Sequence, residues 1–145
     1  RMHPTAILPS YAHGPGEDAG MDLHAVEDVT LEPNVPRLVP TGLTLEIPAG
    51  YEGQVRPRSG LALKHGIAMP NAPGTIDSDY RGELRVILLN AGEKEYVVRR
   101  GDRIAQLVIA PVTTVEFSEC DRLGATDRGD GGVGHSGRDA SGCET

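Results

Sequence analysis

Apolar residues along the chain fall in short runs, which polar and turn-forming residues separate. Residues 43–47 alternate apolar and polar side chains, a period of two that is typical of a strand with one buried face, and Pro48 ends the run. Residues 104–110 form a second run, which Pro111 ends. Residues 86–89 are apolar at every position, which predicts a strand buried on both faces. The pattern therefore favours strands.

Turn-forming residues limit the length of every element. The chain has 11 prolines and 19 glycines, and the prolines recur closely enough to exclude long helices. We predict roughly eight or more short strands joined by turns, hence an all-β sandwich or barrel-like fold. Residues 61–65 are expected to form one helical turn.

Composition narrows the function. The 145 residues suit one domain, and a net charge of −7 argues against nucleic acid polymers, whose binding relies on basic residues. A single nucleotide remains compatible with this charge, because a few arginines suffice for a triphosphate. No apolar run approaches the ~20 residues of a membrane span. The two cysteines have neither zinc spacing nor disulfide density, which favours a cytoplasmic location.

The C-terminal segment differs from the rest of the chain. Residues 124–145 are rich in Gly, Asp, Arg and Ser and almost lack apolar residues, so burial cannot offset their ordering entropy. We therefore divide the chain into a core of residues 1–123 and a flexible tail of residues 124–145. The tail is either a frayed end or a lid that orders over a ligand.

Two stretches carry candidate chemistry. In residues 57–61, the Arg58 guanidinium can bind phosphate oxygens, although a turn with an exposed arginine explains the pattern equally well. Residues 71–83 are expected to form a hairpin, in which Asp77 is a candidate general base and Tyr80 a flat face for a sugar or base. Asp79, by contrast, has the setting of an ordinary solvated turn.

Other polar residues are weaker signals when taken singly. Gln106 can present an amide to phosphate, or is only a polar residue of a strand. Arg128 lies in the glycine-rich tail, and Asp22 follows a glycine at the start of a predicted strand. The five histidines have no metal-ligand spacing, so no protein-bound metal is expected.

The order of five stretches is more specific than any one of them. Ala-Gly-Met-Asp-Leu, Pro-Arg-Ser-Gly-Leu, Gly-Thr-Ile-Asp-Ser-Asp-Tyr-Arg-Gly, Gly-Asp-Arg-Ile-Ala-Gln-Leu and Arg-Gly-Asp-Gly-Gly follow one another along the chain. This order resembles the motifs of the trimeric dUTPase family and spans Ala19 to Gly137. The resemblance implies hydrolysis of dUTP to dUMP and pyrophosphate, which limits uracil in DNA and supplies dUMP for dTTP synthesis. It also implies a jelly-roll-like, distorted β-barrel (β-clip) fold and a homotrimer.

The same resemblance implies roles for individual residues. Asp77 corresponds to the base that orients the attacking water, and Tyr80 to the ring that packs on the deoxyribose. Asp22 has a supporting role. The substrate-binding positions that the resemblance implies are Arg58, Ser59, Gly60, Asn71, Thr75, Ile76, Tyr80, Arg85, Gln106 and Arg128. Each site lies between subunits, and Mg²⁺ is held by substrate phosphates and water.

The last motif departs from the family pattern. Val133 stands where an aromatic residue is expected over the uracil. His135 is a candidate replacement two positions later, and Ser136 a supporting position.

Two alternatives share the fold. One is a bifunctional dCTP deaminase–dUTPase. The motif of such proteins has a Ser-Ser pair after the arginine, whereas Gly60 follows Ser59 here. The other is a regulatory protein that senses dUTP or binds a partner protein.

Overall fold

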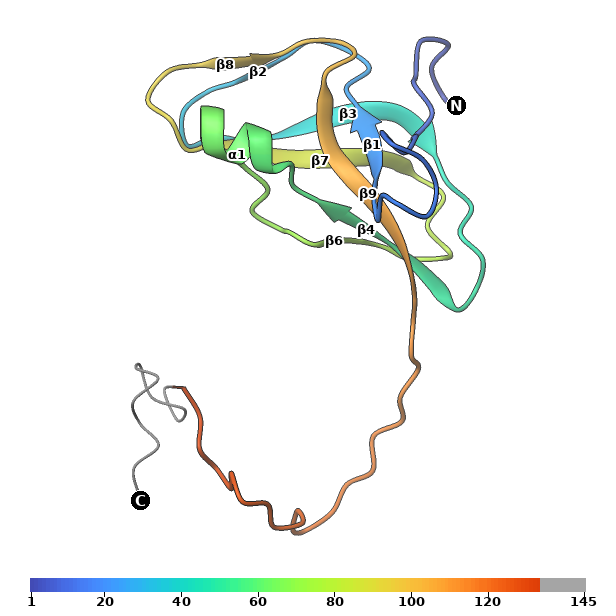
Figure 1. Cartoon of the computed structure of the whole chain (residues 1–145), viewed down its shortest axis with the longest axis vertical. Coiled ribbons are helices and arrows are strands. Elements are labelled where there is room, and N and C mark those ends of the chain that lie inside the picture. Colours follow the sequence, from blue (N-terminus) through green and yellow to red (C-terminus); the bar gives the residue numbers. More distant parts are fainter. Residues whose placement is uncertain (134–145) are drawn as a thin grey trace. The chain divides into compact units, whose positions relative to one another are not determined.

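The computed structural model describes residues 1–133 and confirms the all-β prediction (Figure 1). Nine strands and one helix occur in this part of the chain. The strands are β1 (Met21–His24), β2 (Val29–Leu31), β3 (Pro36–Thr44), β4 (Tyr51–Arg56), β5 (Ile67–Ala68), β6 (Gly74–Ile76), β7 (Glu83–Asn90), β8 (Tyr96–Val98) and β9 (Arg103–Pro111). The helix α1 spans Ser59–His65 and contains the helical turn expected from the sequence.

The strands form three antiparallel sheets. Their orders are β1-β9-β4-β6, β3-β7-β5 and β2-β8. Within residues 1–133, no backbone ladder joins one sheet to another, so the sheets are not closed into a barrel. Side-chain packing connects the sheets, and Asn90 Nδ2 of β7 also donates to the Leu31 carbonyl of β2 at 2.9 Å.

The apolar core joins the two larger sheets. Leu23 of β1 and Leu107 of β9 are buried in one cluster with Val39 of β3 and with Val86 and Leu88 of β7. A fully buried aliphatic side chain stabilises a fold by about 1.5–3 kcal/mol. This cluster therefore holds the sheets together without shared hydrogen bonds.

Strand β7 is buried on one face only, which corrects the prediction for residues 86–89. Val86 and Leu88 are buried, whereas Ile87 and Leu89 beside them are only partly buried. Ile87 and Leu89 thus form a second apolar face of β7, which the rest of the described chain covers only in part.

Strand β3 begins and ends earlier than the alternation of residues 43–47 predicts. It pairs with β7, and the last pair is Thr44 with Glu83. Because Glu83 is the first residue of β7, no strand remains opposite Leu45, and residues 45–47 lie outside the ladder. Pro40 is tolerated in β3 because this strand forms the edge of its sheet and shifts register after Pro40.

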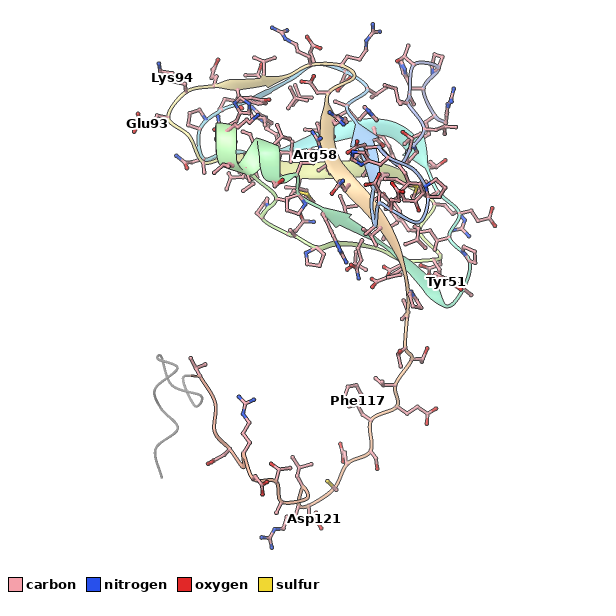
Figure 2. All side chains as sticks on the ribbon, in the orientation of Figure 1. Tyr51, Arg58, Glu93, Lys94, Phe117 and Asp121 are labelled. Carbon is pink, nitrogen blue, oxygen red and sulfur yellow. The ribbon has the colours of Figure 1, made fainter. Side chains whose placement is uncertain are left out.

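Helix α1 leads from β4 to β5. It ends at Gly66, whose left-handed φ of 66° lets its N–H donate to the Ala62 carbonyl. Figure 2 shows Arg58 directly before the helix. At the other end, the His65 ring packs on Tyr96 of β8, with ring centroids 4.9 Å apart. The helix therefore holds Arg58 at a defined place beside the core.

The chain divides into two compact units, Arg1–Thr113 and Thr114–Thr145. In residues 114–133 the second unit contains no strand or helix, and its Phe117 side chain is 98% exposed (Figure 2). In the described part of the chain, no helix is long and apolar enough to cross a membrane.

Candidate active site

The segment between β6 and β7 is a turn that links two sheets. Strand β6 pairs with β4, whereas β7 pairs with β3 and β5. The expected hairpin is therefore wrong, because its two strands bond to different neighbours. Residues 77–82 instead cross from one sheet to the other.

A pocket of about 260 Å³ opens beside this turn. Leu38, Val55, Met69 and Ile87 supply its apolar lining. The remaining lining residues are Asn71, Gly74, Thr75, Ile76, Asp77, Tyr80, Glu83 and Arg85. Six residues predicted from the sequence thus meet here, and apolar walls with convergent polar groups suit a small organic ligand.

Asp77 offers a free carboxylate at this pocket. Its backbone carbonyl accepts from the Tyr80 N–H at 3.1 Å, which closes the turn. Arg81 Nη1 donates to the Ser78 carbonyl at 2.7 Å and to the Tyr80 carbonyl at 3.0 Å, and these two bonds stabilise the turn. Within residues 1–133, the Asp77 carboxylate makes neither a hydrogen bond nor an ion pair, so it is available to accept a proton.

Tyr80 lies over the backbone that follows it. Its hydroxyl donates to the Glu83 carbonyl at 3.0 Å, and 41% of the residue is exposed. The ring therefore forms part of the pocket wall.

Glu83 is a pocket residue that sequence reasoning missed. Its Oε1 accepts from the Gly42 N–H at 2.9 Å, which ties β7 to the irregular part of β3. The available signal was its place directly after Gly82, at the end of the third motif.

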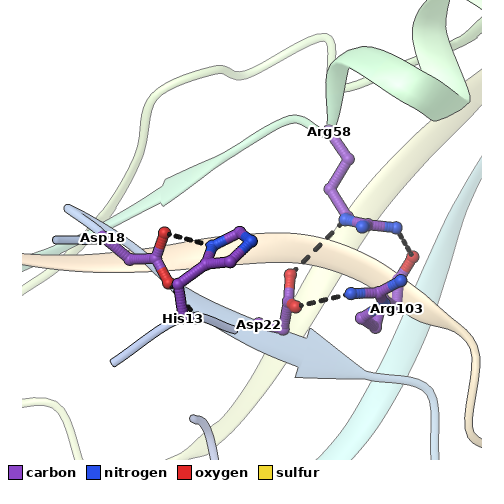
Figure 3. A network of polar contacts seen from close by, with 5 residues as sticks. All are labelled: His13, Asp18, Asp22, Arg58 and Arg103. Carbon is purple, nitrogen blue, oxygen red and sulfur yellow. Dashed lines mark hydrogen bonds and ion pairs between the residues drawn. The ribbon is translucent and has the colours of Figure 1, made fainter. Parts of the chain in front are cut away.

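A second cluster lies around Asp22 (Figure 3). Asp22 Oδ1 lies 3.4 Å from Arg58 Nε, and Oδ2 accepts from Arg103 Nη1 at 3.2 Å. Arg58 Nη1 also donates to the Arg103 carbonyl at 3.2 Å. The Asp22 side chain is only 7% exposed, so one buried carboxylate holds two guanidinium groups. Two cations around one anion leave a net positive group, which suits an anionic ligand.

Arg103 was not among the predicted site residues. It stands in the fourth motif as the first residue of β9, directly after the turn at Gly101 and Asp102. Arg58, Arg103 and Asp102 help to line a second pocket, of about 240 Å³. The place of Arg103 in the fourth motif was a signal that it belongs to the site, but only its contact with Asp22 reveals its role.

The other predicted phosphate contacts lie near this cluster in the fold. Ser59 and Gly60 open α1 directly after Arg58. Gln106 of β9 pairs with Asp22 of β1 on one side and with Arg56 of β4 on the other. This inner strand of the four-stranded sheet therefore brings Gln106 beside Asp22.

Within one chain, the arginine cluster around Asp22 lies outside the pocket that Asp77 lines. Among the described residues that line the 260 Å³ pocket, none is Arg58, Ser59, Gly60 or Gln106. Arg128 belongs to the second unit, where its Nε donates to the Gly131 carbonyl at 2.8 Å, and Val133 is fully exposed. His135 and Ser136 lie outside the described residues.

Histidines flank the Asp22 cluster. Burial lowers the pKa of His24, the last residue of β1, and its Nδ1 has no hydrogen-bond partner among residues 1–133. His13 binds Asp18, and the His13 backbone N–H is the main cause of the lowered pKa of that carboxyl (Figure 3). Residues 1–133 contain no group of three or more His, Cys, Asp or Glu side chains placed to hold a metal ion.

Comparison with known proteins decides the family. A family model described as dUTPase matches residues 7–137. The deoxyuridine 5'-triphosphate nucleotidohydrolase of Solibacter usitatus is 67% identical over 138 residues, which cover 95% of this chain and 93% of the relative. The protein of the same name from Syntrophotalea carbinolica is 55% identical over 139 residues, covering 94% of this chain and 93% of the relative. The chain belongs to the dUTPase family.

Solved dUTPases share the fold. A mutant dUTPase of Staphylococcus bacteriophage 80alpha, solved with dUpNHpp, has a TM-score of 0.87 at 28% identity and covers 94% of this chain and 95% of its own. A mutant dUTPase from phage phi11 of S. aureus, described with a structural Mg(II) ion, has a TM-score of 0.76 at 27% identity, covering 84% of this chain and 94% of its own. Membership of the family thus rests on both sequence and fold.

Proposed function

We propose that this chain hydrolyses dUTP to dUMP and pyrophosphate. Water attacks the α-phosphorus, Asp77 takes its proton, and pyrophosphate leaves. The observation that carries the proposal is the free Asp77 carboxylate at a pocket that Asn71, Tyr80 and Arg85 also line. A base without a competing partner is suited to accept a proton from water.

The pocket holds the nucleoside. Its apolar wall, with Val55 and Ile87, accommodates a flat ring, and Asn71 with the backbone around Thr75 and Ile76 offers hydrogen-bonding groups for uracil. The Tyr80 ring packs on the deoxyribose and leaves no space for a 2′-hydroxyl. The lining of this pocket and the family membership support these roles.

The phosphates are bound by the arginine cluster of another subunit. Arg58, with Ser59, Gly60 and Gln106, lies outside the pocket that contains Asp77. A homotrimer, in which one chain's cluster meets the next chain's pocket, unites the two groups. The partly buried Ile87 and the 52% exposed Leu38 are apolar surface consistent with such an assembly.

The tail completes the site. We assign residues 1–123 to the core and residues 124–145 to a flexible segment whose Arg128 closes on the γ-phosphate. The exposure of Val133 leaves it free to contact the base, but an aliphatic side chain stacks less well than a ring.

Magnesium is the metal ion that membership of the family suggests for this reaction. Asp22 is the one buried carboxylate among residues 1–133, and both its oxygens face arginines, so it does not fit a direct metal ligand. A magnesium ion would be held by the substrate phosphates and water, and would neutralise phosphate charge. Such a reaction suits a cytoplasmic enzyme that limits uracil in DNA and supplies dUMP for dTTP synthesis.

Pyrophosphate release tests the function. The chain is incubated with dUTP, dTTP, dCTP or UTP in the presence of Mg²⁺, and pyrophosphate and ammonia are measured. We expect rapid pyrophosphate release from dUTP alone and no ammonia from dCTP. Release of ammonia indicates the deaminase activity instead, and binding of dUTP without turnover indicates a regulatory protein.

A further inference from the structure

Gly82 follows Arg81, and the Tyr80 ring occupies the space that a side chain at position 82 would fill. A Cβ placed on Gly82 would lie 2.5 Å from Cζ and 2.8 Å from Cε2 of Tyr80, and closer still to the hydroxyl oxygen. Real Cβ atoms essentially never approach other heavy atoms below 3.0 Å. The observed ring position therefore requires glycine at this place.

Backbone conformation does not explain this glycine. Gly82 is not among the positive-φ residues, so its backbone conformation is open to alanine. The three heavy atoms that such a Cβ would meet first all belong to Tyr80, and the residue is exposed rather than packed in the core. The contacts that a side chain would make first at position 82 are thus all with Tyr80.

Two further contacts keep the ring in this place. The Tyr80 hydroxyl donates to the Glu83 carbonyl at 3.0 Å, directly beyond Gly82. Arg81 braces the preceding turn through the Ser78 and Tyr80 carbonyls. The ring is thereby held between a fixed turn and the first residue of β7, along the wall of the 260 Å³ pocket.

We propose that Gly82 is a positioning residue that sets sugar selectivity by letting the Tyr80 ring lie flat on the backbone. This inference rests on the proposed function, because it assigns the sugar contact to Tyr80. A side chain at position 82 displaces the ring and separates its hydroxyl from the Glu83 carbonyl. The deoxyribose of dUTP then loses its packing surface, whereas UTP, already hindered by the ring, has less to lose.

A four-protein cycle tests the inference. The values of kcat/KM for dUTP and UTP are measured for the wild type, Gly82→Ala, Tyr80→Ala and the double variant. We expect Gly82→Ala to raise the UTP/dUTP ratio about tenfold or more, within the range of steric discrimination by a pocket. In the Tyr80→Ala background the same change is expected to leave the ratio unaltered, because coupled residues are not additive.

Asp79→Ala is the matched control. Asp79 is exposed in the same turn and makes no side-chain hydrogen bond or ion pair among the described residues, so its variant should keep the wild-type ratio. If Tyr80→Ala changes the ratio and Gly82→Ala does not, the inference is overturned. It is also overturned if Gly82→Ala still shifts the ratio without the ring. A wild-type chain that fails to hydrolyse dUTP contradicts the proposed function instead.

Discussion

Asp22 of β1 and Arg58, which precedes α1, form an ion pair with 3.4 Å between Oδ1 and Nε. Oδ1 is buried and accepts no hydrogen bond from residues 1–133, so charge attraction alone links these two atoms. Arg103 binds the other oxygen of the same carboxylate. Asp22 therefore holds in place the arginine to which we assign phosphate binding.

Asp22→Asn is expected to weaken both stability and substrate binding. The substitution keeps the side chain's shape but leaves Arg58 and Arg103 without a counter-charge. We expect a loss of about 1.5–3 kcal/mol in the free energy of unfolding, as for hydrogen bonds to charged groups. The KM for dUTP should rise more than kcat falls. Urea unfolding and steady-state kinetics measure the two effects.

Asp18→Asn is the control for this prediction. Asp18 accepts from the backbone N–H of His13 and pairs with its ring rather than with an arginine, so Asp18→Asn should leave the KM for dUTP unchanged. Equal behaviour of the Asp18 and Asp22 variants would contradict a positioning role for Asp22.

Asp77→Asn is expected to remove hydrolysis while dUTP still binds. An amide fills the same space but cannot take a proton from water, and loss of a general base costs about 10²–10⁴-fold in rate. Single-turnover kinetics and calorimetric titration with dUTP separate the two effects. Asp79→Asn should be nearly neutral, and a near wild-type rate for Asp77→Asn would exclude this residue as the base.

Two inactive variants are expected to complement each other. Asp77→Asn and Arg58→Ala are each expected to be inactive as homotrimers, but a mixed trimer contains a site with one intact pocket and one intact arginine cluster. We expect activity to return when the two chains are unfolded together and refolded. Light scattering should give three times the mass of one chain, and a fully active monomer would disprove the shared site.

Removal of residues 124–145 is expected to leave a folded core with poor catalysis. These residues have little apolar surface to contribute to stability. The loss of Arg128 should lower kcat/KM on the order of 10²-fold, the scale of a misplaced reacting group. Thermal unfolding of the truncated chain checks the core, and kinetics with dUTP check the tail.

Val133→Phe and His135→Ala address the unusual last motif. A ring at position 133 should strengthen dUTP binding, because stacking on a base contributes roughly 1–3 kcal/mol. If His135 already supplies the stacking, Val133→Phe has little effect and His135→Ala is the damaging change. Unchanged kinetics in both variants would show that the tail acts through Arg128 and backbone alone.

His24 makes the fold sensitive to mild acid. Burial lowers its pKa in the folded chain below the ordinary 6.5, with Arg103 and Arg58 acting in the same direction and Asp22 opposing them. Below pH 6.5 the unfolded chain binds a proton that the folded chain does not, so stability falls as pH falls. His24→Gln should flatten the decline of the melting temperature between pH 7 and lower pH. His3→Gln, at an exposed position, should leave it unchanged.

The third motif illustrates how much of the site was predictable. Asp77 and Tyr80 are close in sequence, and a short turn keeps them together whatever sheets its ends join. Both residues therefore line one pocket, although the turn that carries them is not the expected hairpin. The sequence did not predict that β6 and β7 pair with different strands, because a turn between two strands is compatible with a hairpin or a crossover.

Contacts between residues far apart in the sequence were harder to predict. The alternation of residues 43–47 is a local property, but a strand also needs a neighbour, and β7 begins only opposite Thr44. Glu83 and Arg103 likewise show their roles only through contacts with Gly42 and Asp22.

Local sequence patterns were enough to predict the strand-rich class, the helical turn before residue 66 and the ordered motifs that mark the family. These depend on local conformational preference and on side-chain chemistry, both of which are legible in a single segment. The tertiary structure decided which strands pair, which face of β7 stays open and which arginines share Asp22. Those outcomes depend on packing between segments far apart in the chain, and no local pattern encodes them.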